Sequence, residues 1–459
     1  MNQHPTASTE STSETGAGRE LWGSRFGFLM AAVGSAVGLG NMWRFPYSTA
    51  EHGGAAFVLL YIIITFVVGV PIMIAEFGLG RSTRRSPIGA LRRAGGAGWA
   101  PAGYLFVAAG FLILAYYSVI AGWVSRYAIE AILTPWPADA GAYFEEVSGS
   151  GLAVVYHLAF MAVTLLIVAG GVKAGIERVS SIAMPILALI LIGIAVWATT
   201  LTNASEGYSY YLTPDFSALF SLDTLAAASA QAFFSLSLGM GAMLTFASYL
   251  SRNTNLPREA AVVALSDFGI AFIAGLVVFP VIFAMGLQDA VSASTVGALF
   301  IAIPGAFVEM GAVGRTVGIL FFVALFIGAI TSAISLLEVV VSSVIDESKI
   351  DRRKAAIIGG IIIALIGILP ARDLTVLNAM DLVAAEVLLP LGGLVLAMLV
   401  GWGAAGRNLD AFAEGASPRT RKLLHGWRWA LRIAVPPLLI VVLYKTIPAG
   451  IEAIRGIGG

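Results

Sequence analysis

Residues 34–47 read GSAVGLGNMWRFPY and lie inside an apolar segment that begins near Phe26. The stretch combines three glycines with the amide of Asn41 and the charge of Arg44. Glycine loosens a helix, and backbone groups that are freed inside a membrane must find partners other than lipid. The stretch therefore predicts a membrane helix that is interrupted along its length.

Composition indicates a membrane protein. The 459 residues are 58% hydrophobic and 12% charged, whereas a soluble domain is about half apolar and about a quarter charged. The mean hydropathy is +0.88. The chain has no cysteine, which excludes disulfides, thiolate metal sites and cysteine nucleophiles. We expect an all-α membrane protein.

Eleven segments of the sequence approach the roughly 20 apolar residues that cross a bilayer as a helix. They are residues 25–50, 54–79, 100–132, 151–170, 179–200, 222–250, 259–287, 314–346, 355–371, 376–402 and 429–446. The segment 293–312 contains IAIPGAF and is too short and broken to span, so we expect an external hairpin loop there.

The basic residues orient the chain in the membrane. With the N-terminus placed inside, the internal stretches hold 21 of the 27 lysines and arginines. The external loops 134–150 and 202–221 hold none, as the positive-inside rule requires. An odd number of spans then places the C-terminus outside. Residues 1–18 are rich in serine and threonine and lack an apolar core, so we expect a disordered cytoplasmic tail rather than a signal peptide.

Ionisable residues within the spans are functional candidates, because a charge in lipid costs several kcal/mol unless it faces protein or water. The candidates are Arg44, Glu76, Asp267, Glu338, Asp381 and Glu386. A surface ion pair is the alternative for Arg44 and Asp381, and a helix-packing contact is the alternative for Glu338. Asp267 lies well inside its span and is harder to explain in either way. Glu76 is expected to hydrogen-bond freed backbone, and the sequence assigns no place to Glu386.

A second cluster of glycine and serine, SLSLGMG, occupies residues 235–241 in the sixth span. Spans one and six are the first members of two five-span halves. Helices broken at corresponding positions of two halves indicate the binding site of a transporter. The halves share no identity at the residue level, so this repeat rests on spacing alone.

These motifs resemble the neurotransmitter:sodium symporter family. The resemblance rests on GSAVGLGNMWRFPY, the following EHGGAAF, QAFFSLSLGMGAMLTFASYL in span six and GAITSAISLLE in span eight. It implies a LeuT-type 5+5 inverted repeat within residues 19–459, with repeats at 19–200 and 222–402 and an extra helix at 429–446. It also implies sodium-coupled uptake across a prokaryotic cell membrane, with two sodium ions and no organic cofactor. The implied partners are a small amino-acid substrate and the lipid bilayer, not nucleic acid.

The resemblance implies two sodium sites. The first would use Ala36, Asn41, Ser235 and Asp267 together with the substrate carboxylate. The second would use carbonyls of Gly34, Val37 and Gly328 and the hydroxyls of Thr331 and Ser332. Sodium is a hard cation that prefers oxygen ligands, which suits both sets. Hydroxyls bonded to the preceding helical turn are the alternative for Thr331 and Ser332.

The resemblance also implies the substrate class. Monoamine carriers of the family place an aspartate where this chain has Gly38, so the substrate must bring its own carboxylate. That group would meet the N–H groups of Leu39 and Gly40 and the hydroxyl of Tyr117. The side-chain pocket would consist of Ile113, Phe234, Ser237, Met240, Ser332 and Leu336. It carries no charge, which predicts a neutral hydrophobic amino acid, aliphatic or aromatic.

The residue at position 267 affects whether transport should depend on chloride. Many family members have asparagine here, and the animal ones need chloride nearby. In this chain Tyr61, Gln231 and Ser235 match chloride-site positions, but the remaining position is Ala271. A fixed carboxylate at Asp267 would replace the charge of chloride, so we expect chloride-independent transport.

By the same resemblance, two gates would close the site in turn. The outer gate would be Arg44 and Asp381, with Phe234 as the lid. The inner gate would be Arg19 and Asp346, with Trp22 as the plug. Two other functions stay open: a proton-coupled carrier in which Asp267 or Glu386 cycles protons, and a sensor that binds without translocating. The four histidines are scattered and no nucleophile motif is present, so we do not expect an enzyme.

Overall fold

The computed structural model describes residues 20–216, 219, 221–287, 295–403 and 410–457. The expected tail at 1–18 and the gate residue Arg19 lie outside the described residues. Within them, every regular element is a helix.

The helices lie along the chain in the following order, divided between its first and second halves by length. In the first half they are α1 (Arg25–Ala36), η1 (Gly40–Arg44), α2 (Phe45–Glu51), α3 (Ala55–Ile64), η2 (Thr65–Gly69), α4 (Val70–Thr83), α5 (Pro87–Gly95), η3 (Ala97–Trp99), α6 (Ala100–Leu133), α7 (Ala140–Gly149), α8 (Gly151–Ala169), η4 (Val172–Glu177), α9 (Arg178–Ala198) and α10 (Ala204–Leu212). In the second they are α11 (Leu222–Ser235), α12 (Ala242–Ala247), α13 (Leu256–Ala284), α15 (Thr295–Gly297), η6 (Ala298–Ala302), α16 (Ile303–Glu309), α17 (Gly311–Ser348), α18 (Arg352–Arg372), α19 (Leu374–Asp381), η7 (Leu382–Leu388), α20 (Leu389–Gly401), α21 (Asp410–Ala413), α22 (Pro418–Trp429), η9 (Ala430–Ala434) and α23 (Val435–Gly456).

Among the described residues, nine helices are long and apolar enough to cross a membrane, and the bent pair at Arg25–Ala36 and Gly40–Glu51 raises the number to ten. The expected sixth span is divided between α11 and α12, which have 14 and 6 residues. Neither is long enough to span alone. The count of eleven and the inverted repeat therefore stay predictions.

The expected break in span one is present. Helix α1 ends at Ala36, and Val37 has an extended backbone with φ −78° and ψ 108°. The chain resumes as the π-helical turn η1 and continues as α2, and the segment Gly40–Glu51 is bent by 46° from α1. The carbonyls at the end of α1 and the N–H groups at the start of η1 thus lose their regular helical partners.

The expected break in span six is also present, between Ser235 and Ala242. Ser237, Gly239 and Gly241 take positive φ values of 53°, 78° and 77°. A Cβ on Gly239 would lie 2.2 Å from the carbonyl oxygen of Leu389, so only glycine allows this approach.

Glu76 of α4 supports this break, as expected from the sequence. Its Oε1 accepts from Gly239 N at 2.8 Å, and its Oε2 accepts from Leu244 N at 3.1 Å. Glu76 itself is fully buried. The carboxylate therefore satisfies two backbone donors that the helix no longer pairs.

Replacing Glu76 by alanine is expected to lower the apparent melting temperature of the purified protein by several degrees, because two buried N–H groups lose their acceptor. Glu76→Gln keeps one acceptor oxygen and should fall between wild type and Glu76→Ala. A melting curve in detergent measures both. Unchanged melting of Glu76→Ala would show that the break needs no such support.

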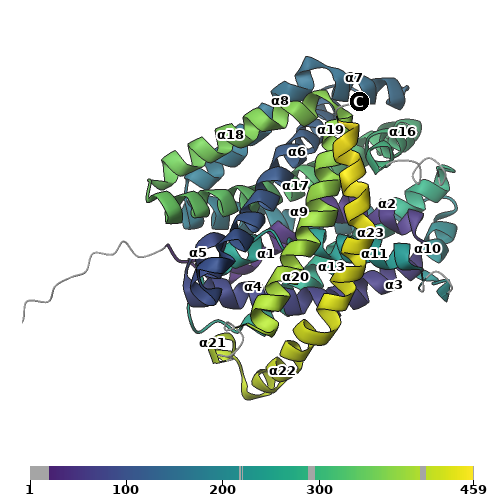
Figure 1. Cartoon of the computed structure of the whole chain (residues 1–459). Coiled ribbons are helices and arrows are strands. Elements are labelled where there is room, and N and C mark those ends of the chain that lie inside the picture. Colours follow the sequence, from purple (N-terminus) through teal and green to yellow (C-terminus); the bar gives the residue numbers. More distant parts are fainter. Residues whose placement is uncertain (1–19, 217–218, 220, 288–294, 404–409, 458–459) are drawn as a thin grey trace, which may run out of the picture.

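The segments assigned to external loops contain helices. The described part of 293–312 forms α15, η6 and α16, none long enough to span. Helix α7 lies in 134–150 and α10 lies in 202–221. In Figure 1, α7 and α16 lie at the end of the molecule where the chain terminates, while α5, α21 and α22 lie away from it.

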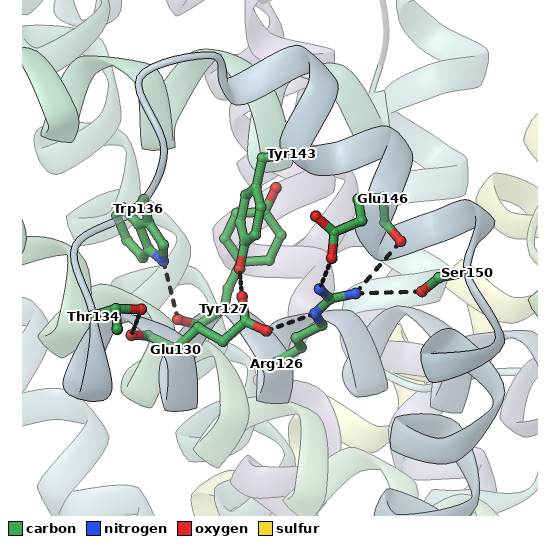
Figure 2. Close-up of polar contacts among 8 residues, drawn as sticks. All are labelled: Arg126, Tyr127, Glu130, Thr134, Trp136, Tyr143, Glu146 and Ser150. Carbon is green, nitrogen blue, oxygen red and sulfur yellow. Dashed lines mark hydrogen bonds and ion pairs between the residues drawn. The ribbon is translucent and has the colours of Figure 1, made fainter.

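A charge cluster around the buried Arg126 connects α7 to the end of α6 (Figure 2). Arg126, whose side chain is 3% exposed, donates to Glu130 Oε1 at 2.8 Å and to Glu146 Oε1 at 2.5 Å. The hydroxyl of Tyr143 donates to Glu130. The Tyr127 hydroxyl donates to the carbonyl of Phe300 at 2.7 Å and so connects η6 to α6.

Candidate functional site

The two breaks meet α6 and α17 around a small buried cavity. Its lining is Ser35, Ala36, Gly38, Gly40, Ile113, Tyr117, Phe234, Ser235, Ser237, Met240, Ser332 and Leu336. Every residue expected to bind substrate is in this lining except Leu39, which lies between two lining residues. The volume of this cavity is about 20 Å³. The lining side chains must therefore move apart to admit a ligand larger than a water molecule.

Bare backbone faces the cavity at Gly38. A Cβ there would lie 2.4 Å from Ser332 Oγ and 2.8 Å from the Tyr117 hydroxyl oxygen. The N–H of Leu39 already donates to that hydroxyl at 3.1 Å. Since η1 begins at Gly40, this point combines a helix N-terminus with a phenol, and both favour an anionic group.

The first expected cation cluster is assembled around Asp267 of α13, which is fully buried. Asn41 Nδ2 donates to its Oδ1 at 2.7 Å. Ser235 Oγ donates to the same carboxylate at 2.8 Å, and the Tyr61 hydroxyl donates at 3.0 Å. Ala36, the last residue of α1, lines the adjacent cavity. One carboxylate among neutral oxygen groups is a donor set that fits a monovalent hard cation.

The expected chloride-site residues also meet this carboxylate or lie beside it. The hydroxyl groups of Tyr61 and Ser235 both donate hydrogen bonds to Asp267. Gln231 donates to the carbonyl of Gly40 at 3.0 Å, while its own Oε1 has no partner among the described residues. Ala271 is fully buried and brings no polar group.

The second expected cluster joins α17 to the end of α1. Ser332 Oγ lies 3.3 Å from the carbonyl oxygen of Gly34 and 3.4 Å from that of Val37. Thr331 Oγ1 donates to the carbonyl of Gly328 at 3.1 Å. Carbonyls and hydroxyls with no carboxylate again suit a hard cation of low charge. The five expected residues therefore lie together. The bond from Thr331 to the carbonyl of Gly328 is also the hydrogen bond to the preceding helical turn that was the alternative for this residue.

Above Phe234, Arg44 binds two acids of span ten. Its guanidinium lies 2.8 Å from Glu386 Oε1 and 3.5 Å from Asp381 Oδ1. The Tyr116 hydroxyl donates to Asp381 at 2.7 Å. Arg44 also lies over the Phe234 ring, 5.2 Å from its centroid. The sequence indicated Asp381 alone, whereas Glu386 makes the shorter contact.

Arg44, Asp381 and Glu386 line a second cavity of about 430 Å³, called the outer cavity below, and Lys445 and Thr446 of span eleven line it as well. Thr446 donates to the backbone carbonyl of Glu386 at 2.8 Å, and Lys445 pairs with Asp223 of α11 at 3.0 Å. No sequence signal connects these residues to the site, because the contact depends on how α23 packs against η7.

Replacing Glu386 by glutamine is expected to loosen the outer closure, since Arg44 loses its shorter ion pair. The chain has no cysteine, so Ala230→Cys in the outer cavity is labelled uniquely. We expect thiol labelling of Ala230→Cys to speed up about threefold to fivefold when Glu386→Gln is added, which corresponds to the loss of one partly exposed ion pair. The exposed Glu452→Gln, a matched charge loss on α23, should leave the rate unchanged. An equal rate with and without Glu386→Gln would contradict the role of Glu386.

On the opposite side, Trp22, the expected inner plug, packs against α12 and α1 and is not among the residues that line the central cavity. Its Nε1 donates to the carbonyl of Phe246 at 2.8 Å, and its ring packs edge-on against Phe246 and Phe28 at 5.3 and 5.9 Å. The expected partner pair of Arg19 and Asp346 cannot be placed, because Arg19 lies outside the described residues.

Asp346 accepts from Ser86 N at 2.6 Å and lines a cavity of about 550 Å³ on this side. Nearby, Glu338 accepts from the Tyr249 hydroxyl and from Arg352, each at 2.5 Å. Glu338 therefore forms an ion pair with Arg352 of α18 and does not line the central cavity. This agrees with the alternative that Glu338 makes a contact between packed helices.

Comparison with known proteins shows similarity to sodium-dependent transporters. The model of the sodium:neurotransmitter symporter family matches residues 19–149 and 145–450. An uncharacterized sodium-dependent transporter of Bacillus subtilis is 34% identical over 443 residues, covering 93% of this chain and 97% of that protein. The crystal structure of MhsT in complex with L-phenylalanine is 40% identical, with a TM-score of 0.85 over 94% of this chain and 100% of that one. The sodium-dependent neutral amino acid transporter B(0)AT2 of Bos taurus is 29% identical over 59% of this chain and 41% of its own length.

Proposed function

Because this chain belongs to the sodium:neurotransmitter symporter family, we propose that it is a sodium-coupled symporter of a neutral hydrophobic L-amino acid. The protein is an integral membrane protein of LeuT-like fold, as its apolar helices and its similarity to MhsT indicate. Within that fold we propose eleven spans arranged as an inverted repeat, with the N-terminus in the cytoplasm of a prokaryote.

The observation that carries the substrate class is the uncharged cavity beside bare backbone at Gly38. Its lining holds no Asp, Glu, Lys or Arg. A charged substrate side chain would be desolvated there without a partner. The amino-acid carboxylate would meet the N–H groups of Leu39 and Gly40 and the Tyr117 hydroxyl. Phe234, Met240 and Leu336 would enclose the side chain, and MhsT supports this assignment because its crystal structure contains L-phenylalanine.

Two sodium ions would be co-transported. One would bind at Asp267, Asn41 and Ser235 and share the substrate carboxylate. The other would bind between Ser332, Thr331 and the carbonyls at the end of α1. Because Asp267 supplies a fixed negative charge, we propose transport that needs no chloride.

Access to the site would alternate between two closures. The outer one is Arg44 with Glu386 and Asp381 above the Phe234 lid, and the inner one includes Trp22. In alternating access the two are never open together. A proton-coupled carrier is the second candidate, because Asp267 and Glu386 are carboxylates on the pathway. A sensor would bind the amino acid without moving it.

Uptake of radiolabelled phenylalanine into proteoliposomes, with all twenty amino acids as competitors, tests the substrate class. We expect aliphatic and aromatic amino acids to compete in a sodium-containing buffer and acidic and basic ones not to compete. Competition by glutamate or lysine at the same concentration would contradict the proposed pocket. Sodium-dependent binding without uptake would favour a sensor.

A further inference from the structure

The helix that leads into span eleven, α22 with η9, is amphipathic and carries basic side chains. Leu424, Trp427, Leu431 and Val435 recur at helical spacing and are 2%, 6%, 0% and 0% exposed. The buried Trp427 also donates from Nε1 to the carbonyl of Pro71 at 2.8 Å. One face of α22 and η9 is therefore fixed to the protein.

Basic residues lie along the edge of this buried face and beyond it. Arg421 and Lys422 are exposed, and among the described residues no carboxylate pairs with either side chain. Arg428 and Arg432 follow at i+7 and i+11 from Arg421, on the same helical stripe. Both donate to the carbonyl of Gly401, at 3.4 and 2.6 Å, so they are held against the end of α20.

Exposed aromatic side chains flank this stripe. Trp429 is 58% exposed, Trp402 is 48% exposed and Ile433 is 63% exposed. Arg432 lies over the Trp429 ring, 5.7 Å from its centroid. Tryptophan at the end of a membrane span marks the level of the lipid headgroups. In Figure 1, α22 lies at one end of the molecule, where α20 ends and α23 begins.

We propose that Arg421, Lys422, Arg428 and Arg432, with Trp402 and Trp429, form a basic surface along α22 and η9 that binds the phosphodiester headgroups of anionic phospholipids. Arginine binds phosphate through two N–H groups at once, and lysine adds a point charge. Apolar Ile433 and the indole rings would contact the acyl-chain region. The ligand chemistry is a phosphodiester held at the membrane surface, and charge complementarity selects it over a zwitterionic headgroup. The site is separate from the transport cavity and does not depend on the proposed substrate.

Thermal stabilisation of the full chain in detergent tests this site with three probes: phosphatidylglycerol, phosphatidylcholine with the same acyl chains, and inorganic phosphate. We expect phosphatidylglycerol to raise the apparent melting temperature at the lowest concentration and phosphate to have no effect. Arg421→Gln with Lys422→Gln should raise the half-saturating phosphatidylglycerol concentration about thirtyfold, given the contribution of each basic residue near anionic lipid.

Arg353→Gln with Lys354→Gln is the matched control. It removes the same charge from exposed positions at the start of α18, and it should bind phosphatidylglycerol like wild type. Arg421→Lys with Lys422→Arg keeps both charges and should also bind. An equal effect of phosphatidylcholine, a stabilisation by phosphate alone, or an equal loss in the control pair would overturn the proposal.

If the Arg421→Gln and Lys422→Gln variant does not fold, the salt dependence of lipid binding by the wild-type protein still tests the proposal. Raising the salt concentration should then weaken phosphatidylglycerol binding and leave phosphatidylcholine binding unchanged. Salt-independent phosphatidylglycerol binding would contradict a site built on these charges.

Discussion

Gly38→Ala is expected to reduce amino-acid uptake by about a hundredfold, the size of loss that a misplacement of about 1 Å at a reacting or binding centre produces. The added methyl would lie 2.4 Å from Ser332 Oγ and 2.8 Å from the Tyr117 hydroxyl oxygen. Both groups would have to move, and they belong to the proposed sodium and carboxylate sites. The measurement is initial uptake into proteoliposomes at matched protein content.

Gly269→Ala provides the matched control. Gly269 lies two residues after Asp267 in α13, and a Cβ there meets nothing within 4 Å. This variant should transport at the wild-type rate, and both variants should melt at similar temperatures. If Gly38→Ala transported normally, the amino-acid carboxylate would not be bound at the break in span one.

Asp267→Asn is expected to make uptake depend on chloride. The substitution removes the one buried charge beside Asn41 and leaves the hydroxyls of Tyr61 and Ser235 without their anionic acceptor. A cation then lacks a counter-charge, so uptake in chloride-free medium should fall at least about tenfold, equivalent to about 1.4 kcal/mol.

Chloride added to Asp267→Asn should restore part of this uptake, whereas wild type should respond little. The measurement is sodium-driven uptake with chloride or gluconate as the main anion. Glu452→Gln, which removes an exposed carboxylate from α23, should behave like wild type. Strong chloride dependence of the wild-type protein would contradict the role given to Asp267.

Much of the site could be predicted because its signals are local. The glycines and polar residues at 34–41 and 235–241 mark both helix breaks, and the structure has them there. Glu76 could be connected to the second break because a buried carboxylate and unpaired N–H groups need each other. The positions that line the cavity came from the family resemblance, since no spacing rule brings α6 and α17 to the breaks.

Other contacts depend on packing that one sequence does not reveal. Glu386 and Arg44 are 342 positions apart, and their pairing depends on how the folded chain brings span ten within reach of span one. Lys445 and Thr446 reach the outer cavity only because α23 lies beside η7. The helix α7 in an expected loop is fixed by the capping bond from Ala142 N to Asp139 and by the burial of Tyr143 and Phe144.

The most direct test of sodium coupling is uptake of labelled phenylalanine into proteoliposomes under two separate gradients. With an inward sodium gradient and equal pH on both sides, we predict accumulation above equilibrium that disappears when the gradient is collapsed. With an inward proton gradient and no sodium, we predict no accumulation. Accumulation driven by protons in the absence of sodium would contradict the sodium-coupled mechanism.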